Sequence, residues 1–225
     1  MDAVKDFNFV SPTFVSVGTA VIPIQDFKLV ADDSLISSWG DSMQVLDDGG
    51  NAVHIYNYTI ADDGFDGETA GWVNEAGDDM ADVNLEPGTC VLINLANNGV
   101  KIQNAGEVRT GEVVYTAGKN FNFLGNTLPC KVNIQDIRLI ADDSLISSWG
   151  DSLQILDAGG NAVHIYNYTI ADDGFDGETA GWVNEAGDDM ADVDIEPGQG
   201  FLLNLAYAGV KVYIPGLDDV SASAE

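Results

Sequence analysis

Residues 43–60 read Met43-Gln-Val-Leu-Asp-Asp-Gly-Gly-Asn-Ala-Val-His-Ile-Tyr-Asn-Tyr-Thr-Ile60. Two extended runs flank a turn rich in glycine, which readily adopts the positive φ angles of tight hairpin turns. In the second run His54, Tyr56 and Tyr58 point to one face of a strand, and the residues between them point to the other. The stretch therefore predicts an antiparallel β-hairpin with some apolar area on both faces.

This hairpin occurs twice, because residues 30–88 recur as residues 140–198 with 53 of 59 positions identical. Four of the six changes exchange apolar side chains of similar volume, which packed cores tolerate. Tandem near-copies are typical of building blocks and multivalent binders, not of a single catalytic cleft. The sequence predicts two homologous domains, residues 1–112 (repeat 1) and residues 113–225 (repeat 2).

Short alternating stretches separated by Gly, Asn and Asp clusters dominate the chain, and no segment keeps a helical period over three turns. The expected fold is all-β, with two tandem antiparallel β-sandwich or barrel-like domains. Turn residues on both sides of residues 90–95 make that run part of a second hairpin. In repeat 1 we expect strands near residues 6–17, 19–30, 43–46, 52–61, 71–74, 89–95 and 100–103.

The joint between the repeats carries strand material that neither end of the chain reproduces. Gly111-Glu-Val-Val-Tyr-Thr-Ala-Gly118 precedes Asn120-Phe-Asn-Phe-Leu124, with a turn expected at residues 117–120. The run Asp6-Phe-Asn-Phe-Val10 matches the second of these segments, but only residues 1–5 stand before it. Each outer module is therefore expected to lack a strand partner.

An unpaired strand edge invites another chain to add a strand. We expect head-to-tail self-association on this basis, with Phe7 and Phe9 in the assembly strand. The alternative is a solvated edge that binds nothing.

The chain is strongly acidic, with 37 acidic against eight basic residues and a formal net charge of -29. That charge repels nucleic-acid phosphates and anionic membrane surfaces, so nucleic-acid binding is excluded. No apolar run approaches the roughly 18 residues that span a bilayer. Residues 1–6 lack the basic and apolar regions of a signal peptide.

Two carboxylate-rich loops recur intact in both repeats. If the two loops meet, they gather oxygen ligands for calcium, the one cofactor we consider. The alternative is a pair of turns in which Asp and Gly satisfy backbone geometry. The candidate ligands are Asp62, Asp63, Asp66, Glu68, Asp78, Asp79 and Asp82 in repeat 1, and Asp172, Asp173, Asp176, Glu178, Asp188, Asp189 and Asp192 in repeat 2.

The tryptophans and the cysteines each allow two interpretations, and the histidines are given one. The tryptophans either stack on sugar ligands or belong to the core; they are Trp39, Trp72, Trp149 and Trp182. Cys90 and Cys130 form one disulfide across the joint or remain two buried free thiols. His54 and His164 are interpreted as strand packing residues, because no histidine or cysteine partner lies near them in the sequence.

Gly150-Asp-Ser-Leu153 has the four letters of a lipase and esterase family. In that family the serine leads from a buried strand into a helix, and a histidine late in the chain acts as base. A β module of this size supplies no such frame, and both histidines fall within alternating runs. No catalytic residue is expected, and the protein is interpreted as a non-enzyme.

One longer pattern carries a resemblance to known proteins. Gly118-Lys-Asn-Phe-Asn-Phe-Leu-Gly-Asn-Thr-Leu-Pro129, followed by residues 134–137, residues 154–161, Trp182 and residues 196–204, resembles a repeat of bacterial cell-surface and extracellular β proteins. The resemblance covers most of both repeats and implies an extracellular or cell-surface setting and a structural role.

The expected function is a non-catalytic, self-associating component of a bacterial surface layer, extracellular filament or particle, assembled by strand addition. The alternatives are a bivalent, calcium-assisted carbohydrate-binding module, with a glycan as partner, and a virion coat or fibre protein.

Overall fold

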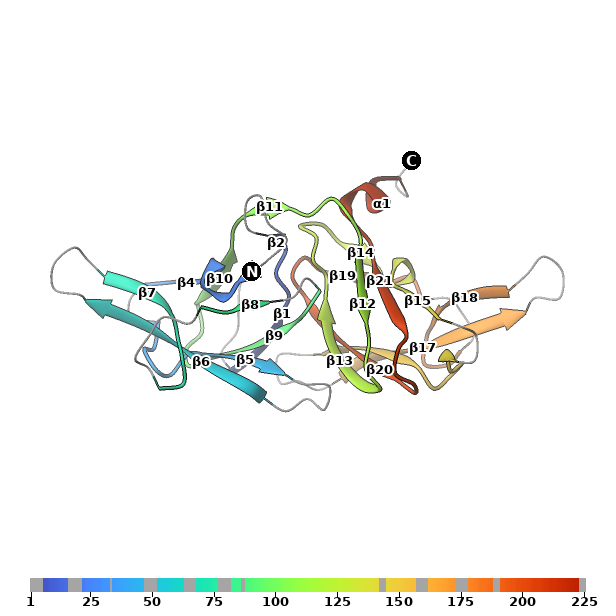
Figure 1. Cartoon of the computed structure of the whole chain (residues 1–225), viewed down its shortest axis with the longest axis horizontal. Coiled ribbons are helices and arrows are strands. Elements are labelled where there is room, and N and C mark those ends of the chain that lie inside the picture. The colour runs from blue at the N-terminus through green and yellow to red at the C-terminus, as the bar shows by residue number, and fades with distance from the viewer. Residues whose placement is uncertain are drawn as a thin grey trace.

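The computed structural model describes residues 6–15, 22–32, 34–46, 52–62, 68–76, 82–85, 88–141, 145–156, 162–172, 178–187 and 191–222. Its strands pair antiparallel throughout these residues, which confirms the predicted all-β class. The strand orders are linear, and no sheet of the described residues closes on itself. The two repeats lie side by side, with β6 and β7 at one end of the molecule and β17 and β18 at the other (Figure 1).

Repeat 1 contains one large sheet and three two-stranded sheets in its described residues. The large sheet has the order β1 (Asp6–Val10), β9 (Val91–Leu95), β5 (Ser42–Leu46), β6 (Ala52–Asp62) and β7 (Glu68–Val73). The small sheets pair β4 (Phe27–Val30) with β10 (Lys101–Asn104), β3 (Ile22–Pro23) with β8 (Asn84–Leu85), and β2 (Phe14–Val15) with β11 (Glu107–Val108). A short 3-10 helix, η1 (Ile24–Asp26), precedes β4.

Repeat 2 has a matching large sheet, and its described residues form two small sheets, one of three strands and one of two. Its large sheet has the order β13 (Asn120–Gly125), β20 (Gly200–Leu205), β16 (Ser152–Leu156), β17 (Ala162–Asp172) and β18 (Glu178–Val183). The small sheets are β14 (Val132–Asn133) with β19 (Asp194–Ile195), and β12 (Val113–Thr116), β21 (Lys211–Ile214) and β15 (Arg138–Ile140) in that order. The 3-10 helix η2 (Ile134–Asp136) and the helix α1 (Leu217–Ala222) complete the repeat. None of the helices that the structure describes is long and apolar enough to cross a membrane.

The predicted hairpin is confirmed, because β5 pairs with β6 and Met43 lies opposite Tyr56. The prediction of a second hairpin that contains residues 90–95 is wrong. The turn at Asn97–Gly99 does not fold β10 back onto β9, since β9 pairs with β1 and β5 while β10 pairs with β4. The chain passes there from the large sheet to a small sheet of the same repeat. The expected strand over residues 19–30 is likewise interrupted by η1.

A buried tryptophan links the large sheet to the small ones in each repeat. Trp72 is fully buried, and its indole N–H donates to the carbonyl of Phe27 at 2.8 Å. Its ring meets Tyr58 edge to face, with centroids 4.9 Å apart, a favoured aromatic geometry. Trp182 makes the same contacts in repeat 2. The interpretation of Trp72 and Trp182 as a sugar-stacking surface is therefore wrong.

The Gly-Asp-Ser motif has a structural role. Asp41 is fully buried, and its two carboxylate oxygens accept the backbone N–H groups of Ser37 at 2.7 Å and Ala96 at 2.8 Å. Asp151 does the same in repeat 2 with the same two distances. A carboxylate that accepts backbone N–H groups offsets the cost of burying its charge. The aspartate thus fastens the loop before β5 to the end of β9.

Candidate functional site

The two repeats meet at a junction formed by the ends of β1 and β13 and the starts of β9 and β20 (Figure 1). Val10 forms a bridge with Gln199, and Thr89 forms a bridge with Leu124. Val10 and Leu124 stand at matching positions of β1 and β13, and Thr89 and Gln199 stand at matching positions before β9 and β20. The same contact is therefore made twice, so the junction has approximate two-fold symmetry.

Backbone hydrogen bonds extend this symmetric contact. The N–H of Ser11 donates to the carbonyl of Gly198 at 2.8 Å, and the N–H of Gly125 donates to the carbonyl of Gly88 at 3.2 Å. Both bonds join one repeat to the other. The junction is thus held by main-chain pairing of the kind that joins neighbouring strands of a sheet.

At two places in the junction, a side chain of repeat 1 occupies the space beside a glycine of repeat 2. A Cβ atom on Gly200 would lie 2.3 Å from the sulfur of Cys90, its counterpart in repeat 1. A Cβ atom on Gly125 would lie 2.4 Å from the Cβ of Ser11, again its counterpart. The junction therefore has room for one side chain of each matching pair, and repeat 1 supplies both.

The disulfide left open by the sequence is not formed, because Cys90 and Cys130 are both free thiols. Cys90 is buried against Gly200, whereas Cys130 is half-buried beyond Asn126, whose side chain donates to its carbonyl at 2.8 Å. Burial raises the pKa of the Cys90 thiol far above its ordinary value. Because the thiolate is the reactive form, we expect Cys90 to react slowly in the folded protein.

We expect a thiol reagent to distinguish the two cysteines. At pH 8 the native protein should react rapidly at one thiol, Cys130, while Cys90 reacts only as fast as the junction opens. Peptide mapping after brief alkylation checks the assignment, and denaturant should release the second thiol. Equal labelling of Cys90 and Cys130 in the native state would contradict the buried junction.

The expected assembly strand lies at this junction. Phe7 and Phe9 belong to β1, which pairs with β9 of the same repeat. The ring of Phe9 stacks on that of Phe123 from β13, with centroids 5.9 Å apart and an interplanar angle of 8°. In the described chain, β1 thus contributes to the contact between the two repeats.

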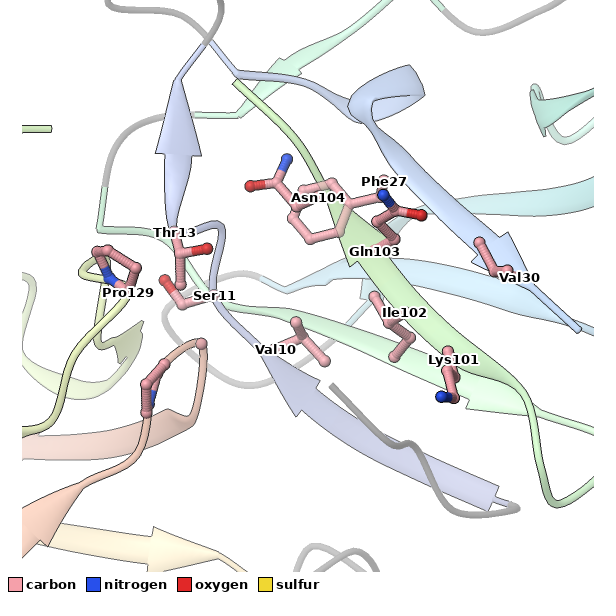
Figure 2. Close-up of a pocket in the computed structure, with 12 residues that line it drawn as sticks. Val10, Ser11, Thr13, Phe27, Val30, Lys101, Ile102, Gln103, Asn104 and Pro129 are labelled. Carbon is pink, nitrogen blue, oxygen red and sulfur yellow. The ribbon is translucent and has the colours of Figure 1, made fainter. Parts of the chain in front are cut away.

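A groove lies beside the junction and is lined mostly by residues of repeat 1. Figure 2 shows Val10, Ser11 and Thr13 on one side of it and β10 on the other, with Pro129 of repeat 2 beyond. Its volume is about 470 Å³. The groove is lined by Val10, Ser11, Thr13, Phe27, Val30, Lys101, Ile102, Gln103, Asn104, Pro129, Pro197 and Gly198.

In repeat 2 the strand β12 fills the matching position. It pairs with β21, with Val113 opposite Ile214 and Thr116 opposite Lys211. The N–H of Ala117 continues the pairing by donating to the carbonyl of Val210 at 2.8 Å. Within the part of repeat 1 that the structure describes, the matching sheet contains only β10 and β4.

A second type of pocket occurs once in each repeat, at the base of the long hairpin. In repeat 1 it has a volume of about 520 Å³ and is lined by Val53, His54, Tyr56, Asn74, Glu75, Ala76, Asp82 and Val83. The pocket of repeat 2, of about 510 Å³, includes His164, Tyr166, Glu185 and Asp192.

The two histidines of these pockets, His54 and His164, are exposed, so their interpretation as packing residues is wrong. Burial, followed by the charge of Glu75, raises the pKa of Tyr56.

The two carboxylate loops do not meet where their ends are described. Asp62 and Glu68 lie opposite each other at the outer end of β6 and β7, while Asp82 lines the pocket at the other end of β7. Six residues of strand separate these ends by roughly 20 Å. In repeat 2, Asp172 likewise lies opposite Glu178 at the outer end of the hairpin, and Asp192 lines the pocket at the other end. Asp192 accepts a hydrogen bond from the side-chain amide of Asn133 at 2.8 Å.

The rest of the calcium prediction lies outside the described residues, and the described ones contain no group of three or more candidate metal ligands. The predicted ligands outside them are Asp63, Asp66, Asp78, Asp79, Asp173, Asp176, Asp188 and Asp189. Of the tryptophans, Trp39 and Trp149 are each 55% exposed and remain open to a ligand.

Sequence reasoning predicted the strand material at residues 111–118, where β12 lies, but not the residues that line the groove. In the sequence, Gly200 stands where Cys90 would recur in repeat 2. The informative signal was the size of the exchanged side chain. A change from cysteine to glycine between otherwise similar repeats marks a position where the two copies contact each other closely.

Comparisons with family models, with curated proteins and with solved structures give no match. The features available for a functional argument are thus the junction, the groove and the duplicated pocket.

Proposed function

We propose that this protein is a non-catalytic structural component that self-associates by strand addition, in a bacterial surface layer, an extracellular filament or a particle. The observation that carries the proposal is the difference between the three-stranded sheet of β12, β21 and β15 and its two-stranded counterpart of β10 and β4. Among the residues that the structure describes, β21 pairs with strands on both of its sides, whereas β10 pairs with β4 alone. A sheet edge with space beside it is the usual acceptor in strand addition.

The contact between the two repeats suits a structural building block. Main-chain pairing and the close contact at Gly125 and Gly200 fix the two repeats against each other. A rigid pair of domains transmits a defined geometry from one subunit to the next, as an ordered assembly requires. The resemblance to bacterial surface repeats favours the same role.

We expect self-association to increase with protein concentration and with salt. Each subunit carries a formal charge of -29, so approaching subunits repel one another. The range of this repulsion falls from about 10 Å at 0.1 M salt to about 3 Å at 1 M. Sedimentation velocity at 0.05 and 0.5 M NaCl, followed by electron microscopy of the larger species, measures the effect. A monomer at every concentration and both salt levels would contradict the proposal.

The duplicated pocket favours a second candidate function, a bivalent carbohydrate-binding module. Each pocket combines an aromatic ring with polar groups that suit sugar hydroxyls, and the exposed Trp39 and Trp149 offer stacking surfaces. A glycan array with and without calcium tests this function. Binding that is lost in a Trp39→Ala, Trp149→Ala double variant, with a monomeric protein throughout, would favour it over assembly.

A further inference from the structure

We infer that the junction is also a contact between copies of this chain, in which repeat 1 of one copy binds repeat 2 of another as it binds its own. The partner is therefore a second copy, and the structure of the contact is the junction itself. This inference rests on the self-association in the proposed function. It adds to strand addition a second contact, made by residues outside β4 and β10.

The bonds that hold the junction do not depend on the connection between the repeats. Besides the two bridges, the N–H of Cys90 donates to the carbonyl of Phe123 at 3.0 Å, and the N–H of Ser11 donates to that of Gly198 at 2.8 Å. All of these residues lie outside residues 109–112, which connect β11 of repeat 1 to β12 of repeat 2. A repeat 2 from another chain can therefore make the same bonds.

The connection between the repeats is short and lies at the surface. β11 pairs with β2 of repeat 1 and β12 pairs with β21 of repeat 2, so residues 109–112 form the linker, along the upper side of the molecule in Figure 1. Residues 110–112 are exposed, and no atom lies within 4 Å of the Cβ position of Gly111. The N–H of Asp218 donates to the carbonyl of Thr110 at 3.5 Å, a long and therefore weak bond. Such a segment can change its φ and ψ angles without disturbing either core, as the hinge of a domain exchange does.

The fit of the junction selects opposite repeats. The sulfur of Cys90 occupies the place beside Gly200, and the Cβ of Ser11 occupies the place beside Gly125. Two copies of repeat 1 would bring two cysteine or two serine side chains to places that hold one. Two copies of repeat 2 would leave both places empty, and close packing disfavours such voids. Repeat 1 should therefore bind repeat 2 of another chain and reject another repeat 1.

Pairing of unlike repeats gives two kinds of assembly. When two chains exchange their repeats reciprocally, both junctions form and a closed dimer results. When each chain passes its repeat 2 to the next chain, the contact is heterologous and does not close, so a filament grows. The repeats of one chain are held at a high effective concentration by their linker, so exchange requires folding at a high protein concentration.

A complementation experiment tests the inference with two full-length variants. In Gly200→Ala the added methyl group meets the sulfur of Cys90, and in Cys90→Gly the same place is left empty. Each variant alone therefore contains a mismatched junction. In a reciprocal dimer of the two variants, one junction pairs the added methyl group with the empty place, and the other junction pairs two unaltered repeats. Both mismatches are thus relieved.

The two variants are unfolded together, refolded at high concentration under reducing conditions and analysed by native mass spectrometry. Because the variants differ in mass, the mixed dimer is distinguished from the dimers of either variant. We expect the mixed dimer to exceed its statistical share by at least about tenfold. Gly111→Ala mixed with Cys90→Gly is the matched control and should give no such excess, because the new methyl group contacts nothing. No mixed dimer, or the same ratio as in the control, would overturn the inference.

A second pair of variants repeats the test at the other close contact, should Gly200→Ala fail to refold. This pair is Gly125→Ala with Ser11→Gly, and it should show the same excess of mixed dimer.

A charge in the groove separates this exchange from strand addition. Figure 2 shows Val30 on the opposite side of the groove from Ser11. Val30→Asp in both variants should leave the excess of mixed dimer unchanged, and a loss of the excess would overturn the inference. Mixed dimers beside a wild type that stays monomeric under native conditions would refute strand addition and leave the exchange intact; wild-type oligomers without mixed dimers would do the reverse.

Discussion

Replacing Asp41 by alanine should lower the free energy of unfolding by about 3 kcal/mol, because it leaves the N–H groups of Ser37 and Ala96 without their acceptor. Each abandoned donor costs about 1–3 kcal/mol, and here both belong to partly buried backbone. Asp151→Ala should have the same effect in repeat 2, where the same two bonds are made. Urea unfolding, followed by far-UV circular dichroism, measures the loss.

Two further variants separate the hydrogen bonds from the charge. Asp41→Asn keeps one acceptor oxygen and should cost roughly half as much as Asp41→Ala. Asp32→Ala removes an exposed carboxylate nearby and should change stability by less than about 0.5 kcal/mol. If Asp41→Ala were as mild as Asp32→Ala, the aspartate of the Gly-Asp-Ser motif would not fasten its loop to the end of β9.

Replacing Gly200 by alanine should destabilise the junction by about 1–3 kcal/mol, the usual cost of overpacking a close contact. The new methyl group would lie 2.3 Å from the sulfur of Cys90 and 3.0 Å from the Cβ of Phe9. Cys90→Gly should relieve the larger clash, so the double variant should be more stable than Gly200→Ala alone. Gly125→Ala, rescued by Ser11→Gly, repeats the test at the other close contact.

The double-mutant cycle decides whether these residues act on each other. We expect a favourable coupling of at least about 1 kcal/mol between Gly200→Ala and Cys90→Gly. Gly111→Ala is the control, because no atom lies within 4 Å of its Cβ position. Purely additive effects in the cycle would show that the two repeats do not meet through these positions.

The local pattern of the sequence predicted the fold class and the main hairpin, because alternation and glycine-rich turns are read over a few residues. It missed the path after Leu95, since a turn at residues 97–99 serves a hairpin and a crossover between sheets equally well. It also misjudged His54, because alternation separates two faces of a strand without showing which of them is covered. Here Tyr56 and Tyr58 are buried and His54 on the same face is not.

The groove could not be predicted from the sequence, because it depends on contacts between the two repeats. The strand at residues 113–116 was predicted from the extended run at the joint between the repeats. The groove, however, is lined by residues from both repeats, including Ser11, Pro129 and Gly198. No local pattern brings such distant positions together. The duplication supplied a signal only where the two copies differ, as at Cys90 and Gly200.

The junction and the groove share the residues Ser11 and Gly198. Ser11 contacts repeat 2 through both its backbone N–H and its side chain, and it also lines the groove. Gly198 accepts that N–H and lines the same groove. A strand bound beside β10 would therefore contact both repeats, so binding and the packing of the junction should stabilise each other.

Sedimentation velocity of a Val30→Asp variant beside the wild type, at matched concentrations and 0.5 M NaCl, tests the central claim most directly. Val30 lines the groove and is 44% exposed, so the change adds a charge there without altering the buried core. We predict that the wild type forms concentration-dependent oligomers and that the folded variant associates more weakly. A variant that associates as strongly as the wild type would contradict strand addition at the groove.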